Sequence, residues 1–284
     1  MRRYFPLLFL LVLAGICFAA GLIESALGIS SNEADLGSRF LPPSNAHYLG
    51  TDELGRDVFI RLLYGGQISL IVALAAGLCS AFIGTTIGMA AGYAGGRWDA
   101  LLMRFTDLLI SLPALPLLII LSALDLQKLG FSAASAASEN ASLYKIIAII
   151  SLLGWTTVAR LARARTLTLK EMDFVMAARA LGVKGWRIVL RHILPNLMGT
   201  VIVATALAAG NIILLESVLS FLGLGIQPPL PSWGNMLTSA EQLMWEHAWL
   251  TVYPGALIFA TVLAFNFMGD SLQAALDPRK KTQS

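Results

Sequence analysis

Charged residues are scarce in this sequence. Asp, Glu, Lys and Arg make up only 13% of the 284 residues, whereas hydrophobic residues make up 57%, and the mean hydropathy is +0.73. A soluble domain carries about a quarter charged residues, so this composition excludes an ordinary soluble protein. The net charge is only +3, and the basic residues lie at the ends of apolar runs. Because they do not share one solvated face, we expect no nucleic-acid partner.

Cysteine and histidine are equally rare, and their scarcity removes several kinds of site. Cys17 and Cys79 lie inside apolar runs and have neither disulfide nor metal-ligand spacing. There is no H-E-x-x-H, no G-x-S-x-G and no Gly-Lys dipeptide, so there is no P-loop. We therefore expect no metal, no cofactor and no catalytic residue in this chain, and any ATP must be bound by another subunit.

Apolar runs of membrane-spanning length make up most of the chain. Lipid offers backbone groups no hydrogen-bond partner, so runs of about 20 apolar residues predict helices. The expected fold class is an all-α polytopic membrane protein with six transmembrane helices. The predicted spans are 4–23, 68–92, 105–124, 143–159, 197–222 and 251–268.

The N-terminal part allows alternatives. The first run resembles a signal peptide, but its length and the five later spans favour an uncleaved transmembrane helix. In the polar segment 24–67, a short interfacial helix is expected from Thr51, with Val58 and Leu62 on the membrane and Asp52 and Asp57 in water. The same segment could instead form a surface for an external partner.

Small residues and prolines predict how the spans pack. Gly84, Gly88 and Gly92 recur every four residues, a spacing that lets two helices pack backbone to backbone in lipid. Pro113 and Pro116 interrupt the third span and predict a break or kink there.

The fifth span contains two polar residues, Asn211 and Glu216. An intramembrane carboxylate is a candidate functional site, so both residues are candidates for a substrate pathway. A capping role near the membrane interface is the alternative for Glu216. The Gly and Pro content of 223–234 excludes a regular helix, and Trp233 suits an interfacial aromatic belt.

The segment 171–195, EMDFVMAARALGVKGWRIVLRHILP, predicts two short amphipathic helices between spans four and five. In the first, Phe174, Ala178 and Leu181 share a face, and Gly182 is a natural stop. Pro195 predicts a break before the next span. The apolar face expected for the second helix consists of Trp186, Val189, Leu190 and Ile193.

The distribution of basic residues predicts the orientation in the membrane. Six spans place the N-terminus, the 93–104 elbow, the 160–191 loop and the tail on one side, which carries 15 of the 20 Lys and Arg residues. The other side carries 5. By the positive-inside rule, both termini and the 160–191 loop are expected in the cytoplasm.

The 171–195 segment resembles the EAA loop of bacterial ABC importer permeases. That pattern is Glu-Ala-Ala, three residues, Gly, nine residues, Ile, one residue, Leu-Pro. Here Ala177-Ala178 are followed at that spacing by Gly182 and by Leu194-Pro195, whereas Met176 replaces the Glu and His192 replaces the Ile.

Four further stretches narrow the resemblance. They are similar to the dipeptide/oligopeptide/nickel permease family, specifically its second or C-type permease: LGTDELGRDVFIRLLYGGQISL (49–70), RHILPN (191–196), ESVLSFLGLGIQPPLPSWGNML (216–237) and DPR (277–279). The likeness extends from about residue 1 to 279. It implies the type I ABC importer fold, with residues 1–66 as the first helix and external segment, 67–272 as the transmembrane domain with a coupling loop at 160–195, and 273–284 as a cytoplasmic tail.

The resemblance also implies partners and a role. The partners are a homologous second permease subunit, two P-loop ATPase subunits and an external solute-binding protein, assembled in the lipid bilayer of the bacterial inner membrane. We expect one half of an ATP-driven pathway for di- or oligopeptides or a related small solute. The residues implied to couple the chain to the ATPase are Met176, Ala177, Ala178, Arg179, Gly182, Leu194 and Pro195.

Two other functions predict different features. A stand-alone secondary transporter or channel predicts inverted repeats and ionisable residues at the midplane. A membrane enzyme requires a nucleophile and a base at membrane depth. Neither set of features is evident in the sequence, so the importer permease remains the favoured interpretation.

Overall fold

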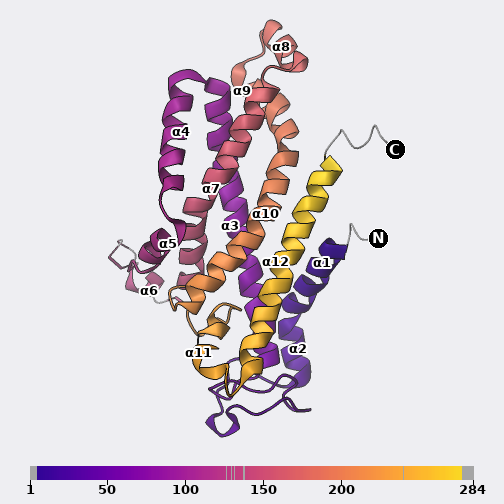
Figure 1. Cartoon of the computed structure of the whole chain (residues 1–284), viewed down its shortest axis with the longest axis vertical. Coiled ribbons are helices and arrows are strands. Elements are labelled where there is room, and N and C mark those ends of the chain that lie inside the picture. Colours follow the sequence, from indigo (N-terminus) through magenta and orange to yellow (C-terminus); the bar gives the residue numbers. More distant parts are fainter. Residues whose placement is uncertain are drawn as a thin grey trace.

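The computed structural model describes residues 5–276, except 126, 129, 131, 137 and 239. This part of the chain forms an elongated helical bundle (Figure 1) and contains no β-strand, which confirms the all-α expectation. The long helices are α3 (Val58–Ala94), α4 (Gly96–Ser111), α7 (Ala141–Leu169), α10 (Leu194–Phe221) and α12 (Ala248–Leu276). Shorter α-helices are α1 (Phe5–Phe18), α2 (Ala20–Leu27), α5 (Ala114–Ser122), α6 (Ala133–Ala136), α8 (Asp173–Ala180), α9 (Gly185–Ile188) and α11 (Ala240–Leu243). Two 3-10 turns, Leu36–Ser38 and Asn235–Leu237, and a π turn, Val189–Ile193, complete the described elements.

The membrane-spanning segments agree with the six-span expectation once bent helices are paired. Four helical segments of the described chain are long and apolar enough to cross a membrane: 58–94, 141–169, 185–221 and 248–276. Two further pairs pass the same test together: α1 with α2, bent by 49°, and α4 with α5, bent by 85°. Counting each pair as one span gives up to six.

The sharp bend between α4 and α5 occurs at Pro113, as the sequence predicts. Leu112 is extended, with ψ 137°, because the ring of a following proline disfavours the helical conformation. Pro113 then begins α5 as its N-cap residue. Pro116 lies in the first turn of α5, where a missing N–H breaks no intrahelical bond.

The glycines of α3 form the close contact with α7 that their spacing predicts. A Cβ atom added at Gly84 would lie 2.5 Å from the carbonyl oxygen of Trp155, and one added at Gly88 would lie 2.3 Å from that of Ala159. At Gly92 it would lie 2.9 Å from Thr166 Cβ. The two helices therefore touch backbone to backbone along this stripe.

The expected interfacial helix before the second span is wrong. Val58 begins α3 itself, which runs on without interruption to Ala94. Asp57 does not face water: it is buried, and its Oδ1 accepts a hydrogen bond from the Ile60 amide at 2.9 Å as the N-cap of α3. The sequence pattern was misread because the polar residues 50–57 fold back on one another and bury their own side chains.

Two hydrophobic clusters hold the bundle together. The larger lies among α1, α3, α7, α10 and α12 and includes Leu70, Ile146 and Ile213. The smaller lies at the end that carries α8 and joins that helix to α3, α7 and α10, including Met89 and Val175. The second cluster makes α8 part of the folded body.

Candidate functional site

Helix α8 stands at one end of the bundle, where α7 and α10 meet (Figure 1). Its buried residues are Val175, which is fully buried, and Ala178. The three residues that the spacing places on one face differ in exposure, since Ala178 is buried whereas Phe174 is 42% exposed and Leu181 is 84% exposed. The buried residues of α8 are Val175 and Ala178, so the side of the helix that packs on the bundle begins one residue after Phe174.

The other side of α8 forms a small exposed surface. It consists of Phe174, Met176, Ala177, Arg179 and Leu181, and we call it the α8 surface. Five of the seven predicted coupling residues lie on α8 or directly after it, so the fold brings them together. The other two, Leu194 and Pro195, begin α10, and Leu194 packs against the hydrophobic cluster beneath α8.

Gly182 ends α8 in the manner its position predicts. Its φ of +77° is the left-handed conformation that glycine adopts without steric cost. The Val183 amide donates to the Ala178 carbonyl at 3.1 Å, and the Gly182 amide donates to the Arg179 carbonyl at 3.0 Å. This pair of bonds is a Schellman motif, which closes the helix and turns the chain toward α9.

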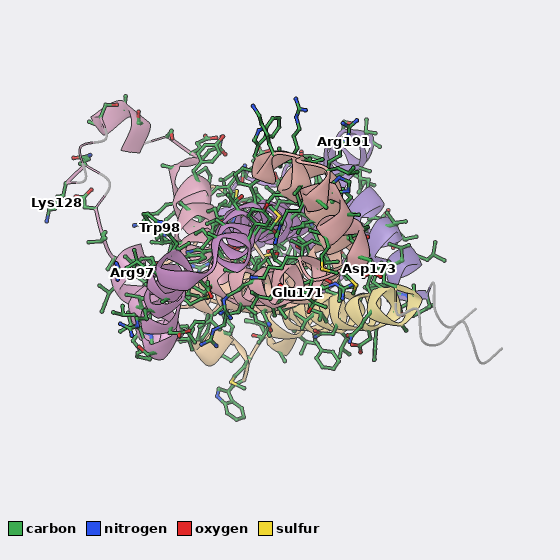
Figure 2. The ribbon with its side chains drawn as sticks, turned by 90° about the horizontal axis from the view of Figure 1, so that it is seen from above. Arg97, Trp98, Lys128, Glu171, Asp173 and Arg191 are labelled. Atoms are coloured by element: carbon green, nitrogen blue, oxygen red, sulfur yellow. The ribbon has the colours of Figure 1, made fainter. Side chains whose placement is uncertain are left out.

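Polar contacts join the ends of α3, α4 and α7 to one another, and a cation–π contact joins α3 to α8. The Arg179 guanidinium lies 6.0 Å from the centre of the Tyr93 ring. Arg163 of α7 makes two contacts of 2.5 and 2.6 Å with Asp99 of α4, and Lys170 donates to the Gly92 carbonyl at 3.2 Å. In the view from above (Figure 2), α4 with Arg97 and Trp98 lies on one side and the α8 region on the other.

A π turn joins α9 to α10, and no break occurs at Pro195. The Leu194 amide donates to the carbonyl of Val189, five residues earlier, and Pro195 follows in the first turn of α10. Residues 185–221 thus form one continuous helical segment. The predicted break is wrong because the wider π turn accommodates a residue that lacks an N–H. It also explains the buried residues of this stretch, Ile188 and Ile193, which are five residues apart.

A groove of about 390 Å³ lies among α3, α4, α5, α7 and α10. Asn211 is exposed on its wall. The other polar lining residues are Thr157, which is exposed, and Ser80 and Thr156, which are buried, and most of the remaining lining residues are aliphatic. None of the residues that line it is charged. This neutral, partly polar groove is where a solute could contact the spans.

Glu216 does not line this groove. Its side chain is fully buried between α10 and α3, and its carboxylate accepts hydrogen bonds from Ser220 at 2.7 Å and Ser69 at 3.2 Å. The geometry therefore separates the two polar residues of the fifth span: Asn211 is open to the groove, whereas Glu216 is enclosed.

Trp233 is not in an interfacial belt. It is fully buried, and its indole N–H donates to the Leu62 carbonyl at 2.9 Å. The sequence alone does not distinguish a buried Trp233 from an interfacial one, because either kind of tryptophan can lie in a loop next to a span.

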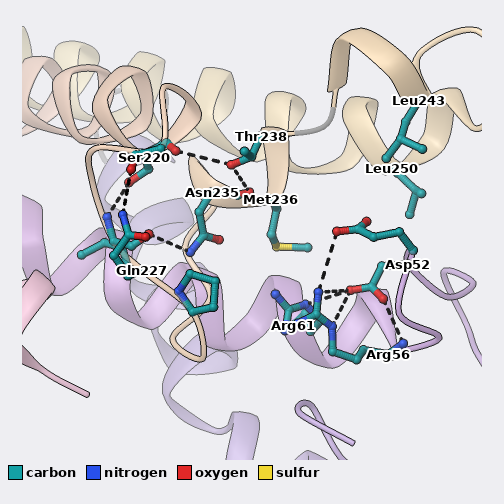
Figure 3. A pocket seen from close by; sticks show the side chains of 14 residues that line it. Asp52, Arg56, Arg61, Ser220, Gln227, Asn235, Met236, Thr238, Leu243 and Leu250 are labelled. Atoms are coloured by element: carbon teal, nitrogen blue, oxygen red, sulfur yellow. Dashed lines mark hydrogen bonds and ion pairs between the residues drawn. The ribbon is translucent and has the colours of Figure 1, made fainter. Parts of the chain in front are cut away.

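The opposite end of the bundle carries a polar pocket of about 330 Å³ (Figure 3). On one side, Asp52 pairs with Arg56 at 2.8 Å and with Arg61 at 3.3 Å. On the other side lie Gln227 and Asn235, from the loop after α10. The pocket thus joins the two polar segments, 28–57 and 223–247, that connect the spans at this end.

Comparison with known proteins identifies the chain. The family model described as the binding-protein-dependent transport system inner membrane component matches residues 84–282. The chain belongs to this family. The matched region includes the glycine contact of α3, the lining of the groove apart from Ser80, α8 and Glu216, so the family match covers most of the candidate site.

Curated relatives of this permease are transport proteins for peptides. The dipeptide transport system permease protein DppC of Bacillus subtilis is 42% identical over 84% of this chain and 71% of its own length. The glutathione transport system permease protein GsiD of Pectobacterium atrosepticum is 39% identical, over 84% and 75%. The oligopeptide transport system permease protein OppC of Bacillus subtilis is 37% identical, over 84% and 73%.

The family and the helices together define what the chain is. It is a C-type permease subunit of an ABC importer of the dipeptide/oligopeptide group, with the type I importer fold. It is a multi-pass protein of the inner membrane. These findings confirm the resemblance that the EAA-like segment and the GTDELGRD, LSFLGLG and PSWG stretches indicate.

Proposed function

We propose that this permease forms half of the pathway of a peptide importer driven by ATP. Two separate P-loop ATPase subunits supply the energy, a homologous second permease supplies the other half, and an external binding protein delivers the solute. The names of the relatives support a substrate that is a dipeptide, an oligopeptide or a glutathione-like peptide. The chain itself needs no cofactor in this scheme.

The α8 surface is the observation that carries the proposal. A helix of eight residues, fixed by Val175 and Ala178 to a hydrophobic cluster, exposes Met176, Ala177 and Arg179 at the end of the bundle. Ala177 and Gly182 bring little side-chain bulk, so another protein can approach the backbone closely. Because the 185–221 segment begins just after α8, a displacement of α8 is transmitted directly to α10.

Met176 stands where the EAA pattern has Glu. Its side chain is 47% exposed, so the thioether replaces a charged contact with an adaptable apolar one. We propose that the ATPase surface facing Met176 is correspondingly apolar.

The orientation follows from the same assignment. With α8 on the cytoplasmic ATPase, both termini are cytoplasmic, and the Asp52–Asn235 pocket end faces the external binding protein. The groove beside Asn211 then faces the second permease subunit and forms one wall of the pathway.

The test uses the complete transporter. The permease is co-expressed with its genomic neighbours, purified and reconstituted in vesicles, and uptake of a labelled dipeptide is measured with and without ATP. Ala177→Trp is expected to abolish co-purification of the ATPase, whereas Ala100→Trp, on the exposed side of α4, leaves it intact. Nucleotide-independent uptake by the permease alone would instead support a stand-alone transporter and overturn the proposal.

A further inference from the structure

Glu216 is the centre of a buried hydrogen-bonded cluster that joins three parts of the chain. Its Oε1 accepts from Ser220, one turn further along α10, and its Oε2 accepts from Ser69 of α3. The side chains of Glu216, Ser69 and Ser220 are all at most 1% exposed. No ion pair to Glu216 is formed within the described part of the chain.

The loop after α10 is bound through the same two serines. The Ile226 amide donates to Ser220 Oγ at 3.0 Å, and the Trp233 amide donates to Ser69 Oγ at 3.3 Å. Each serine therefore donates to the carboxylate and accepts from the loop. Glu216 thus orients both hydroxyls that hold residues 226–233 against α3 and α10.

Glycines allow this loop to lie directly on the helices. A Cβ atom added at Gly234 would lie 2.6 Å from Ser217 Cα, and one added at Gly66 would lie 2.8 Å from the Trp233 ring and 2.4 Å from Cys17 Sγ. Trp233 therefore fills a notch in α3 that Cys17 of α1 also lines. We call Glu216, Ser69, Ser220, Trp233 and Gly234 the Glu216 anchor.

The anchor and α8 lie at opposite ends of one helical segment. From Ile193, at the end of the π turn, to Glu216 the chain advances 23 residues, which is about 35 Å of helix. Asn211 lies about 7.5 Å from the anchor along the axis, and Ala204, which also lines the groove, lies about 18 Å away.

We propose that Glu216 is a positioning residue that keeps the outer end of α10 fixed to α3 throughout transport, so that α10 tilts about this point when α8 is displaced. This inference rests on the proposed coupling role of α8. A rigid helix that pivots at Glu216 moves little at Asn211 and about half as far at Ala204 as at the π turn. The groove therefore changes width mainly at its α8 side.

The alternative is a gate, in which the contacts of the Glu216 anchor open in one state of the transport cycle. Opening would expose the carboxylate, both serines and the Trp233 notch to solvent in one state of the cycle. A fixed anchor keeps them enclosed in every state. Thiol accessibility distinguishes the two, and Cys17 is a native reporter because its sulfur lies in the notch.

The first experiment labels the reconstituted importer, carrying Cys79→Ser, with a membrane-permeant maleimide. Labelling is measured by mass spectrometry in the nucleotide-free state and in an ATP-bound state with hydrolysis arrested. Cys17 and an introduced Ser69→Cys are expected to stay unlabelled in both states, while Ala204→Cys changes severalfold in rate. Labelling of Cys17 or of Ser69→Cys in either state, in a transporter with normal uptake, overturns the proposal.

The second experiment measures peptide taken up per ATP hydrolysed. Glu216→Ala is expected to lose most of this ratio while the ATPase still co-purifies, and Glu216→Gln, which keeps the shape and an acceptor oxygen, is expected to retain most of it. Ser151→Ala, which removes a buried hydroxyl from α7, is the matched control. An unchanged ratio in Glu216→Ala overturns the role of Glu216. Loss of ATPase co-purification on Ala177→Trp tests α8 docking separately, so the two failures are distinguishable.

Discussion

The contact between α3 and α7 offers a sharp prediction, because two glycines of the same helix differ in what surrounds them. Gly88→Ala adds a Cβ atom 2.3 Å from the carbonyl oxygen of Ala159 and 2.7 Å from Ala162 Cβ. Both neighbours belong to α7, so neither can move aside without the helix. Gly77→Ala, three turns earlier in α3, meets Thr205 Cγ2 at 3.5 Å and Ile212 Cδ1 at 3.7 Å, both ordinary van der Waals contacts.

Two opposing contributions determine how these substitutions change the free energy of unfolding: steric overpacking and the backbone entropy of glycine. Overpacking at Gly88 is expected to cost about 1–3 kcal/mol in the free energy of unfolding. The same substitution at Gly77 gains about 0.5–1 kcal/mol, because alanine loses less backbone entropy in a helix. The entropy gain applies at both positions because both glycines lie inside α3, so the two variants should differ by the overpacking cost alone, about 1–3 kcal/mol, although the chemical change is identical.

The assay is thermal unfolding of the purified transporter in detergent, followed by the fraction of monodisperse complex after heating. Gly88→Ala is expected to unfold at a lower temperature and to take up less peptide in vesicles, since the α3–α7 contact supports α8. Gly77→Ala should match or exceed the parent protein. If the two variants unfold at the same temperature, the backbone contact at Gly88 does not hold the bundle together.

Three further outcomes are expected. Asp57→Ala removes the N-cap of α3 and should lower the free energy of unfolding by about 0.5–2 kcal/mol, whereas Asp57→Asn should restore most of it; chemical denaturation measures both. Arg163→Ala breaks the partly buried bidentate ion pair with Asp99. It should destabilise the transporter more than Arg160→Ala, because the ion pair of Arg160 with Asp107 is exposed and contributes about 0–1 kcal/mol. The same denaturation measurement ranks the two variants. Gly182→Val places a β-branched residue at a φ of +77°, so it should misplace the end of α8 and lower ATP hydrolysis by the complex in a phosphate-release assay, while Ala180→Val should not.

Features that depend on a local sequence pattern or on the lipid environment could be predicted from the sequence. Apolar length predicts the spans, Pro113 predicts the bend between α4 and α5, and the four-residue spacing of Gly84 and Gly88 predicts a close helix contact. Gly182 also ends its helix as expected. In each case one physical requirement, such as a missing N–H or a missing Cβ, acts within a few residues.

Features that depend on distant partners were misread. The polar residues around Asp52 indicated a solvated helix. Asp52 is instead buried, because its carboxylate forms ion pairs with Arg56 and Arg61. Trp233 indicated a membrane interface, yet Gly66 of α3, far away in the sequence, provides the notch that buries it. No local pattern contains that information, and the same holds for the two serines that enclose Glu216.

The π turn between α9 and α10 sets the direction in which α8 points relative to α10. An α-helix turns by about 100° per residue, and a π turn holds one residue more than an α-helical turn. Deleting one residue from Val189–Ile193 would restore regular α-helix and rotate α8 by about 100° relative to the groove. The single extra residue therefore decides which way α8 points relative to the groove.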